Sequence, residues 1–189
     1  MIRTQEDTPR LISAGRFTEA LRTLEAATGP KPADPEMGVL RAELLERTGA
    51  YLQSRLIAER LLASRGLSVS HQARCEFVLG IVDWGSGNTE EATVHFQRAV
   101  ARSQAAGDLQ RLCWAQLRLM VVLADRTGAS GAAPILDAVR SNTTRLGDPT
   151  VTAALHIFIG ELEAKRGFIH SAKRHTSLGQ RLLVYRDHH

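Results

Sequence analysis

The chain has 189 residues, of which 43% are hydrophobic and only 5% aromatic, and its formal net charge at pH 7 is +4. This modest charge is not gathered into a basic tail or stripe, so the composition does not indicate nucleic-acid binding. Two cysteines are too few for a disulfide framework, and no apolar run approaches the ~18 residues that cross a bilayer, so we expect a cytosolic protein outside the membrane.

A pattern of one turn and one helix recurs along the chain, beginning in the stretch AGRFTEALRTLEAA at residues 14–27. Each copy has a glycine followed five residues later by a small residue, and successive glycines lie 34, 38, 41 and 39 residues apart. The five pairs are Gly15 with Ala20, Gly49 with Ser54, Gly87 with Ala92, Gly128 with Ala133, and Gly167 with Ala172. Such a period is typical of a helical solenoid, whose neighbouring units bury one continuous core.

Each part of the pattern has a physical reason. The run before each glycine has a helical period, as in QARCEFVLGIVDW before Gly87. Glycine ends such a helix because it adopts a left-handed conformation without a Cβ penalty. Asn88 and the following Thr89-Glu90-Glu91 indicate the N-cap and acidic first turn of the next helix. The small residue then lets the two helices pack closely.

The pattern predicts ten helices along the chain. Their expected ranges are residues 8–14, 17–28, 36–48, 51–65, 70–85, 89–105, 108–126, 131–144, 149–166 and 168–185. Pro30, Pro32 and Pro35 break the chain after the first unit, and Gly147-Asp148-Pro149 breaks it before the fifth. We interpret these as turns between repeats, so residues 1–189 form one domain with units of about 1–33, 34–67, 68–106, 107–147 and 148–187.

The repeat resembles the tetratricopeptide repeat (TPR) over nearly the whole chain. The third unit matches best, through Leu79, Gly80, Gly87, Ala92, Phe96 and Ala99, and the first matches through Gly15, Phe17, Ala20, Leu24, Ala27 and Pro32. The resemblance implies an all-α, right-handed superhelix of about five antiparallel helix pairs. Units three to five are longer than the 34-residue unit of the family and imply longer helices. This uneven pattern is similar to the degenerate repeats of large bacterial regulators.

No residue constellation predicts a catalytic centre. The chain has no nucleophile elbow, and GSGN at 85–88 lacks the spaced glycines of a phosphate or dinucleotide loop. His71 and Cys75 have the spacing of two zinc ligands on one helix, but buried thiols fit the pattern better and two further ligands are missing. His170 and His175 point to different helix faces. We therefore expect no enzyme activity, no metal and no cofactor.

The resemblance to the TPR family also implies a binding groove, because the first helix of each unit lines the concave surface in that family. The groove positions carried over to this chain are Arg74, Phe77, Ile81, Trp84, Arg118, Val122, Asp125, Ile157 and Glu161, with Val39, Glu43 and Glu46 in unit two. A groove with Trp, Phe and Arg suits a partner helix or an extended peptide. The alternative is that Phe77 and Ile81 pack against the neighbouring repeat. The Lys/Asn clamp for C-terminal carboxylates is not present at these positions.

The final predicted helix contains the apolar run Leu182, Leu183, Val184 and Tyr185, whereas solenoids usually end in a polar capping helix. We expect either that the chain is a piece of a longer protein or that this helix forms a homodimer. No function is assigned to His188-His189.

Three functions are compatible with this reading of the sequence. The first is a non-enzymatic scaffold that binds a protein or peptide, as a module of a bacterial transcriptional or signalling regulator. The second is a sensor domain that binds a small-molecule or peptide signal in the groove, with Trp84 and Phe77 lining the pocket. The third, nucleic-acid binding, rests only on the number of arginines.

Overall fold

The computed structural model describes residues 2–29 and 34–186, and it describes side chains for residues 7–29 and 34–183. The described residues form helices and no strand, which confirms the all-α prediction. The helices are α1 (Ile2–Ser13), α2 (Phe17–Thr28), α3 (Pro35–Arg47), α4 (Tyr51–Ala63), α5 (Val69–Gly85), α6 (Thr89–Ala105), α7 (Leu109–Thr127), α8 (Ala129–Leu146), α9 (Pro149–Lys165) and α10 (Ile169–Arg186). The first predicted helix, 8–14, was too short, because α1 already begins at Ile2. Pro30, Pro32 and His188-His189 lie outside the described residues.

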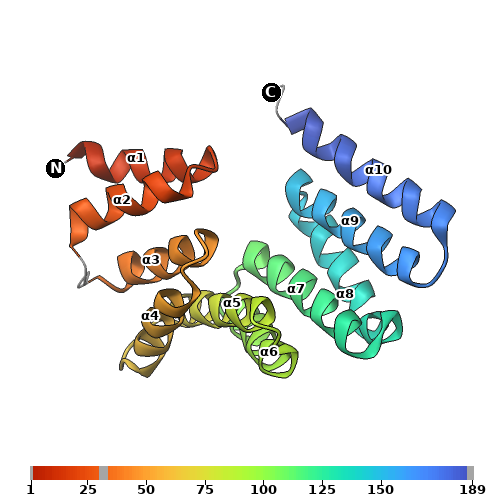
Figure 1. Cartoon of the computed structure of the whole chain (residues 1–189), viewed down its shortest axis with the longest axis horizontal. Coiled ribbons are helices and arrows are strands. Elements are labelled where there is room, and N and C mark those ends of the chain that lie inside the picture. The colour runs from red at the N-terminus through yellow and green to blue at the C-terminus, as the bar shows by residue number, and fades with distance from the viewer. Residues whose placement is uncertain (1, 30–33, 187–189) are drawn as a thin grey trace.

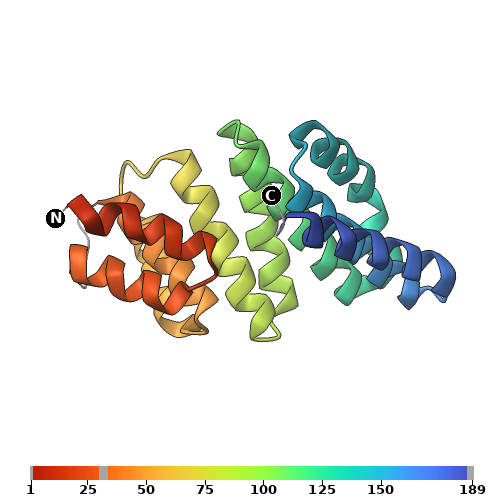
Figure 2. The same ribbon diagram turned by 90° about the horizontal axis from the view of Figure 1, so that it is seen from above.

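The helices form a curved array of consecutive pairs. Figure 1 shows an arc that opens between α1 and α10, and Figure 2 shows the pairs following one another along the long axis. The odd-numbered helices α3, α5, α7 and α9 contact one another in sequence, and each packs against the even-numbered helix that follows it. The helices of units three to five are the longer ones, with 17 residues in α5 and 19 in α7 against 13 in α3, as the sequence predicted.

Side-chain caps mark the beginning of the inner helices. Asp34 accepts a hydrogen bond from Glu36 N at 3.0 Å, and Asp148 accepts one from Thr150 N at 2.7 Å, each just before a proline at the first helical position. Asn88 occupies the cap position of α6, and Glu90 and Glu91 lie in the first turn, as predicted. The Asn88 side chain itself makes no capping hydrogen bond.

Turn glycines end the helices that the sequence analysis identified. At Gly15, Gly49, Gly87 and Gly167 φ is between 72° and 83°, and the residue after each glycine donates a backbone hydrogen bond to the carbonyl five positions back, as in Asn88 N to Asp83 O at 2.9 Å. This is the Schellman geometry, which satisfies carbonyls that the helix end leaves without partners.

Unit four departs from this geometry. Gly128 has φ 78° and ψ 177°, and α8 begins at the next residue, whereas the other second helices begin two residues after their glycine. The small residue at which the two helices of the unit pack together is therefore shifted by one position. Ala132 is 1% exposed and packs against α7, while Ala133 is exposed. The prediction of Ala133 as the packing residue was wrong. In the other units Ala20, Ser54, Ala92 and Ala172 are buried, as predicted.

The core lies between the two layers of helices. In unit three Phe96 of α6 is fully buried beside Gly80 of α5, and its ring meets that of Phe77 edge to face at 5.7 Å. An added Cβ on Gly80 would lie 2.7 Å from the Phe96 ring, so only glycine permits this approach. Gly80 and Phe96, two of the residues through which the third unit resembles the TPR family, therefore belong to one contact.

A buried ionic cluster joins α4, α5 and α6. Glu76 and Asp83 of α5 are each 2% exposed. Glu76 pairs with His95 Nδ1 at 2.6 Å and with Arg102 Nη1 at 2.8 Å, and Asp83 pairs with Arg55 of α4. The cationic partners lie at the edge of the cluster, with side-chain exposures between 19% and 32%. The acids are therefore the desolvated members, and their burial depends on these partners.

Candidate functional site

Ion pairs cover the inner face of α5 in the first half of the array. Glu43 of α3 accepts two hydrogen bonds from Arg74 of α5, at 2.9 and 2.6 Å, and one from Arg111 of α7 at 3.2 Å. Arg74 also donates to Glu36 at 2.5 Å. Side chains of α3 and α7 thus meet across α5.

The hydrogen-bond donors of Arg74 are consequently used by carboxylates of the same chain. Arg74 is 9% exposed. Burial acts to lower the pKa of Arg74, but the hydrogen bonds to Glu43 and Glu36 more than offset burial, and the net pKa is raised. A bidentate pair of this kind leaves little of the guanidinium for a partner. Arg74 is therefore not part of the open inner surface.

Two further groove positions lie in the core beneath the surface. Val122 has no exposed surface and Ile81 is 9% exposed, and both pack in the cluster that contains Phe96. Phe77 is partly buried against the same cluster. Phe77 and Ile81 pack in one cluster with Leu119 and Val122 of α7, the next unit. This is the alternative that the sequence left open for these two residues. These side chains support the surface and do not form its outer layer.

The open part of the inner surface lies over α5, α7 and α9. The guanidinium of Arg118 is 5.6 Å from the centroid of the Trp84 ring and 5.8 Å from that of Phe158. Trp84 Nε1 donates to Asp125 at 3.1 Å, and Lys165 donates to the same carboxylate at 2.7 Å. We call these five residues, Trp84, Arg118, Asp125, Phe158 and Lys165, the Arg118 surface.

Arg118 lacks the partners that the other inner arginines have. Its Nε atom is buried without a hydrogen-bond partner, and among the described residues no ion pair to it is recorded. Burial lowers the pKa of Arg118, and the charges of Glu46 and Glu161 only partly oppose this, since neither carboxylate lies within ion-pair distance. Burial in turn raises the pKa of Glu46. Arg118 is therefore a partly desolvated cation with free donors.

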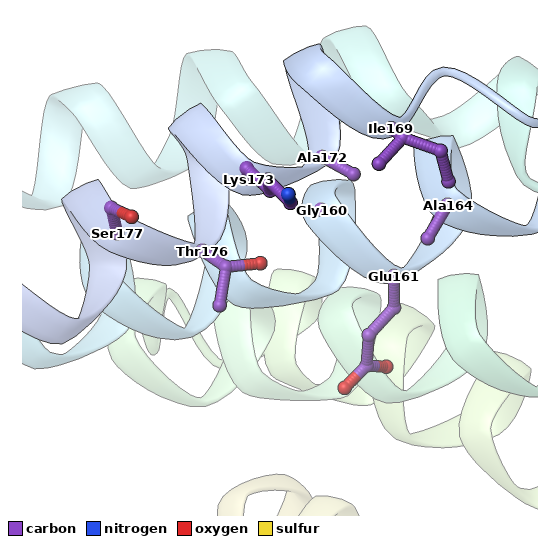
Figure 3. Close-up of a pocket in the computed structure, with 8 residues that line it drawn as sticks. All are labelled: Gly160, Glu161, Ala164, Ile169, Ala172, Lys173, Thr176 and Ser177. Carbon is purple, nitrogen blue, oxygen red and sulfur yellow. The ribbon is translucent and has the colours of Figure 1, made fainter.

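The sequence identified three of the five residues of the Arg118 surface: Trp84, Arg118 and Asp125. It missed Phe158, choosing its neighbour Ile157, which instead lies against Gly179 of α10. It also missed Lys165 as a groove residue. Glu161 is exposed and extends from α9 away from α10 (Figure 3). The sequence could have indicated Lys165, because it follows the predicted groove residue Glu161 by four positions and residues at that spacing share one helix face.

The other candidates for chemistry have structural surroundings. Cys75 is fully buried, and burial raises the pKa of its thiol to about 12. His71 Nε2 lies 2.8 Å from Glu36. Among the described residues there is no group of three or more potential metal ligands, and none of the described helices combines the length and apolarity that a membrane span requires.

A histidine pair joins α9 and α10. Nδ1 of His156 and Nδ1 of His175 are 2.9 Å apart, and the two rings are stacked with centroids 5.1 Å apart. Burial lowers the pKa of His156 from its ordinary 6.5, and the charges of His175 and Arg140 lower it further. His170, considered with His175 in the sequence, is exposed and belongs to no such pair.

The pair predicts a loss of stability in acid. Because the pKa of His156 is lower in the folded chain, the unfolded chain binds more protons as the pH falls below about 6.5, and folding weakens there. Above that pH the contribution is constant. We expect the melting temperature to fall less between pH 7.5 and pH 5.5 in His156→Gln than in the wild type, measured in a cationic buffer with chloride as the anion. An equal fall in both proteins would contradict this assignment.

The helix order, the turn geometry and the inner surface together define a TPR-like helical solenoid. No protein-family model matches the sequence, and no curated protein matches it. Similar crystal structures include BtubC from P. vanneervenii, with a TM-score of 0.68 and 18% identity over 99% of this chain and 77% of that one. MamA has a TM-score of 0.61 and 15% identity over 96% of this chain and 97% of its own. A putative kinesin light chain with nearly identical TPR-like repeats, from Podosopora anserina, has a TM-score of 0.65 and 15% identity over 99% and 96%.

Proposed function

We propose that the protein is a non-enzymatic scaffold that binds an extended or helical segment of a partner protein on the Arg118 surface. The observation that carries this proposal is Arg118 itself, whose buried Nε has no acceptor within the described chain. A charged donor that is desolvated without a partner costs stability. A binding site can carry such a cost because its ligand supplies the missing acceptor. Functional sites often lower the stability of the protein when no ligand is bound.

The surroundings of Arg118 specify the chemistry of that segment. Trp84 and Phe158 offer aromatic surface on two sides of the guanidinium, and aromatic residues with arginine are the usual anchors of protein interfaces. A carboxylate on the partner would accept hydrogen bonds from Arg118, and apolar side chains beside it would cover the rings. We therefore infer a segment with an acidic residue flanked by apolar ones.

The small-molecule alternative has less support. Two depressions, one between α9 and α10 and one between α8, α9 and α10, are lined by residues of units four and five. Neither is lined by Trp84 or Phe77, the residues expected in a sensor pocket. We retain the sensor as the second candidate.

We further propose that the scaffold works within a larger bacterial regulator, on the ground of its uneven, degenerate repeats. The reading frame of the gene tests this point separately. An adjoining ATPase or DNA-binding domain is expected, and a reading frame or operon confined to metabolic enzymes would argue against it. Homodimerisation through α10 also stays a proposal: Leu183 is 38% exposed, while the side chains of Val184 and Tyr185 lie outside the described residues.

The binding proposal is tested by selecting peptides from a displayed library against the wild-type chain. Selected peptides are expected to share an acidic residue, and Arg118→Met is expected to weaken their binding at least tenfold, as loss of a partly buried charge pair does. Trp84→Ala should weaken binding as well. Arg98→Met on the exposed side of α6 is the matched control and should leave affinity unchanged. Failure to select any peptide, or selected peptides indifferent to both variants, would refute the proposed surface.

A melting curve separates a binding role for Arg118 from a structural one. Because Arg118→Met removes a partly buried cation without partners, we expect its melting temperature to equal or exceed that of the wild type. A clear decrease would mean that Arg118 holds the fold together. In that case reduced peptide binding by the variant would not support the proposal.

A further inference from the structure

A cavity in the last two units shares no lining residue with the Arg118 surface. It measures about 570 Å³ and lies between α8, α9 and α10, at the blue end of the arc in Figure 1. Its polar lining consists of Arg140, Thr143, Thr144, Thr152, His156 and His175. Leu155 and Ile159 supply the apolar part. No carboxylate lines this cavity, although the chain carries 20 acidic residues.

The fixed charge in the cavity lining is the guanidinium of Arg140. Among the described residues no hydrogen bond or ion pair of the Arg140 guanidinium is recorded. Thr143 is 2% exposed, and its Oγ1 has no oxygen or nitrogen partner, its neighbour being the thiol of Cys113. The Thr143 hydroxyl therefore faces Cys113 of α7, and the hydroxyls that remain for a ligand of the cavity are those of the other threonines in its lining.

The histidine pair adds a donor that depends on protonation. With the two Nδ1 atoms 2.9 Å apart, one neutral ring donates to the other, so the neutral pair holds one proton between the rings. In that state only one of the two Nε2 atoms carries a hydrogen. A further proton turns the pair into a monocation in which both Nε2 atoms are donors.

We propose that this cavity binds the oxyanion group of a small organic anion, a phosphate or a carboxylate, and that binding is coupled to uptake of one proton by the His156–His175 pair. Arg140 supplies a fixed positive charge, Thr144 supplies a hydroxyl donor, and Leu155 and Ile159 contact the apolar body of the ligand. The site is separate from the Arg118 surface, so it stands independently of the proposed function.

The coupling follows from the charges that act on His156. Arg140 on α8 and His175 on α10 are the groups whose charges lower its pKa, and burial acts in the same direction. An anion placed among these groups favours the protonated imidazole and therefore raises that pKa. By linkage, the anion must bind more tightly where the pair is already protonated.

A neighbouring depression supplies a control residue. The depression between α9 and α10 has a volume of about 420 Å³ and one lysine, Lys173, in its lining (Figure 3). Lys173 is a cation on the same pair of helices but does not line the proposed anion site. Lys173→Ala therefore serves as the matched control.

The test uses sulfate and benzenesulfonate, because neither changes its charge between pH 5.5 and pH 7.5 and any pH dependence then belongs to the protein. Binding is followed by calorimetry and by the NMR shifts of the imidazole C–H groups. We expect benzenesulfonate to bind at least fivefold more tightly at pH 5.5 than at pH 7.5, with proton uptake. Phenyl phosphate and benzoate, compared at pH 5.5, then show which oxyanion the cavity prefers.

The variants decide the assignment. Arg140→Ala is expected to weaken binding at least fivefold at both pH values, and His156→Gln is expected to abolish the pH dependence. Lys173→Ala should change neither. If Arg140→Ala binds as tightly as the wild type, or if the wild-type affinity is the same at both pH values, the proposal is wrong. His175→Gln provides a second test of the pair if His156→Gln does not fold.

Discussion

Gly80→Ala is expected to destabilise the wild-type chain but to stabilise the Phe96→Ala variant. In the wild type the new methyl group would lie 2.7 Å from the Phe96 ring, and this overpacking costs about 1–3 kcal/mol. Without the ring the methyl group has room, and alanine gains about 1 kcal/mol over glycine in a helix. Phe96→Ala itself is expected to cost about 3–5 kcal/mol, because the ring is fully buried.

Urea unfolding of the two single variants and the double variant measures this reversal. Gly38→Ala on α3 is the matched control: its nearest neighbour is Leu61 Cδ2 at 3.3 Å, a flexible side chain that can move. We expect the control to be neutral or stabilising. If Gly80→Ala has the same effect with and without the Phe96 ring, the close contact between α5 and α6 does not exist as described.

Removing the cation Arg55 is expected to destabilise the chain more than neutralising its partner Asp83. Arg55→Met would leave the carboxylate of Asp83, 2% exposed, with only His95 at 3.6 Å, and breaking a buried pair in this way costs about 3–5 kcal/mol. Asp83→Asn would leave Arg55, which is 28% exposed and lies 3.6 Å from Glu59, able to use water and that second acid. We expect a loss of about 1.5–3 kcal/mol for that change, the usual range for a hydrogen bond to a charged group.

The double variant Arg55→Met with Asp83→Asn completes the cycle. A neutral amide is cheaper to bury than a carboxylate without a partner, so the double variant should be at least about 1 kcal/mol more stable than Arg55→Met alone. Equal losses for the two single variants, with no recovery in the double variant, would mean that Asp83 is not the desolvated member of the pair.

The turns could be predicted from the sequence because their chemistry is local. A glycine at the end of a helix and a small residue five positions later are both read within one unit, and four of the five joints follow that rule. Gly128 breaks it, since its ψ of 177° brings α8 forward by one residue. The spacing of residues in a sequence does not determine the backbone ψ angle of the turn glycine. The sequence therefore could not show whether Ala132 or Ala133 packs against α7.

The candidate site was only partly predictable because it depends on how far the array curves. The sequence placed Trp84, Arg118 and Asp125 on one side of successive helices, and the structure brings them together. Arg74 is covered because Glu36 and Glu43 of α3 reach it, whereas Arg118 meets aromatic rings of α5 and α9. Which side chains meet across neighbouring units depends on the packing between units, and the sequence of a single repeat does not encode it.

The bridge from Glu43 to Arg111 joins residues 68 positions apart and passes over an entire intervening unit. Elsewhere in the described chain the helices contact near neighbours in sequence, so the array can bend elastically at each contact between neighbouring units. When the ends of the array are pulled apart, an ion pair on the inside of the bend would resist the straightening of the arc. Since this ion pair is partly exposed, dissolved salt would weaken it, and the resistance of the array to opening would then decrease as the ionic strength rises.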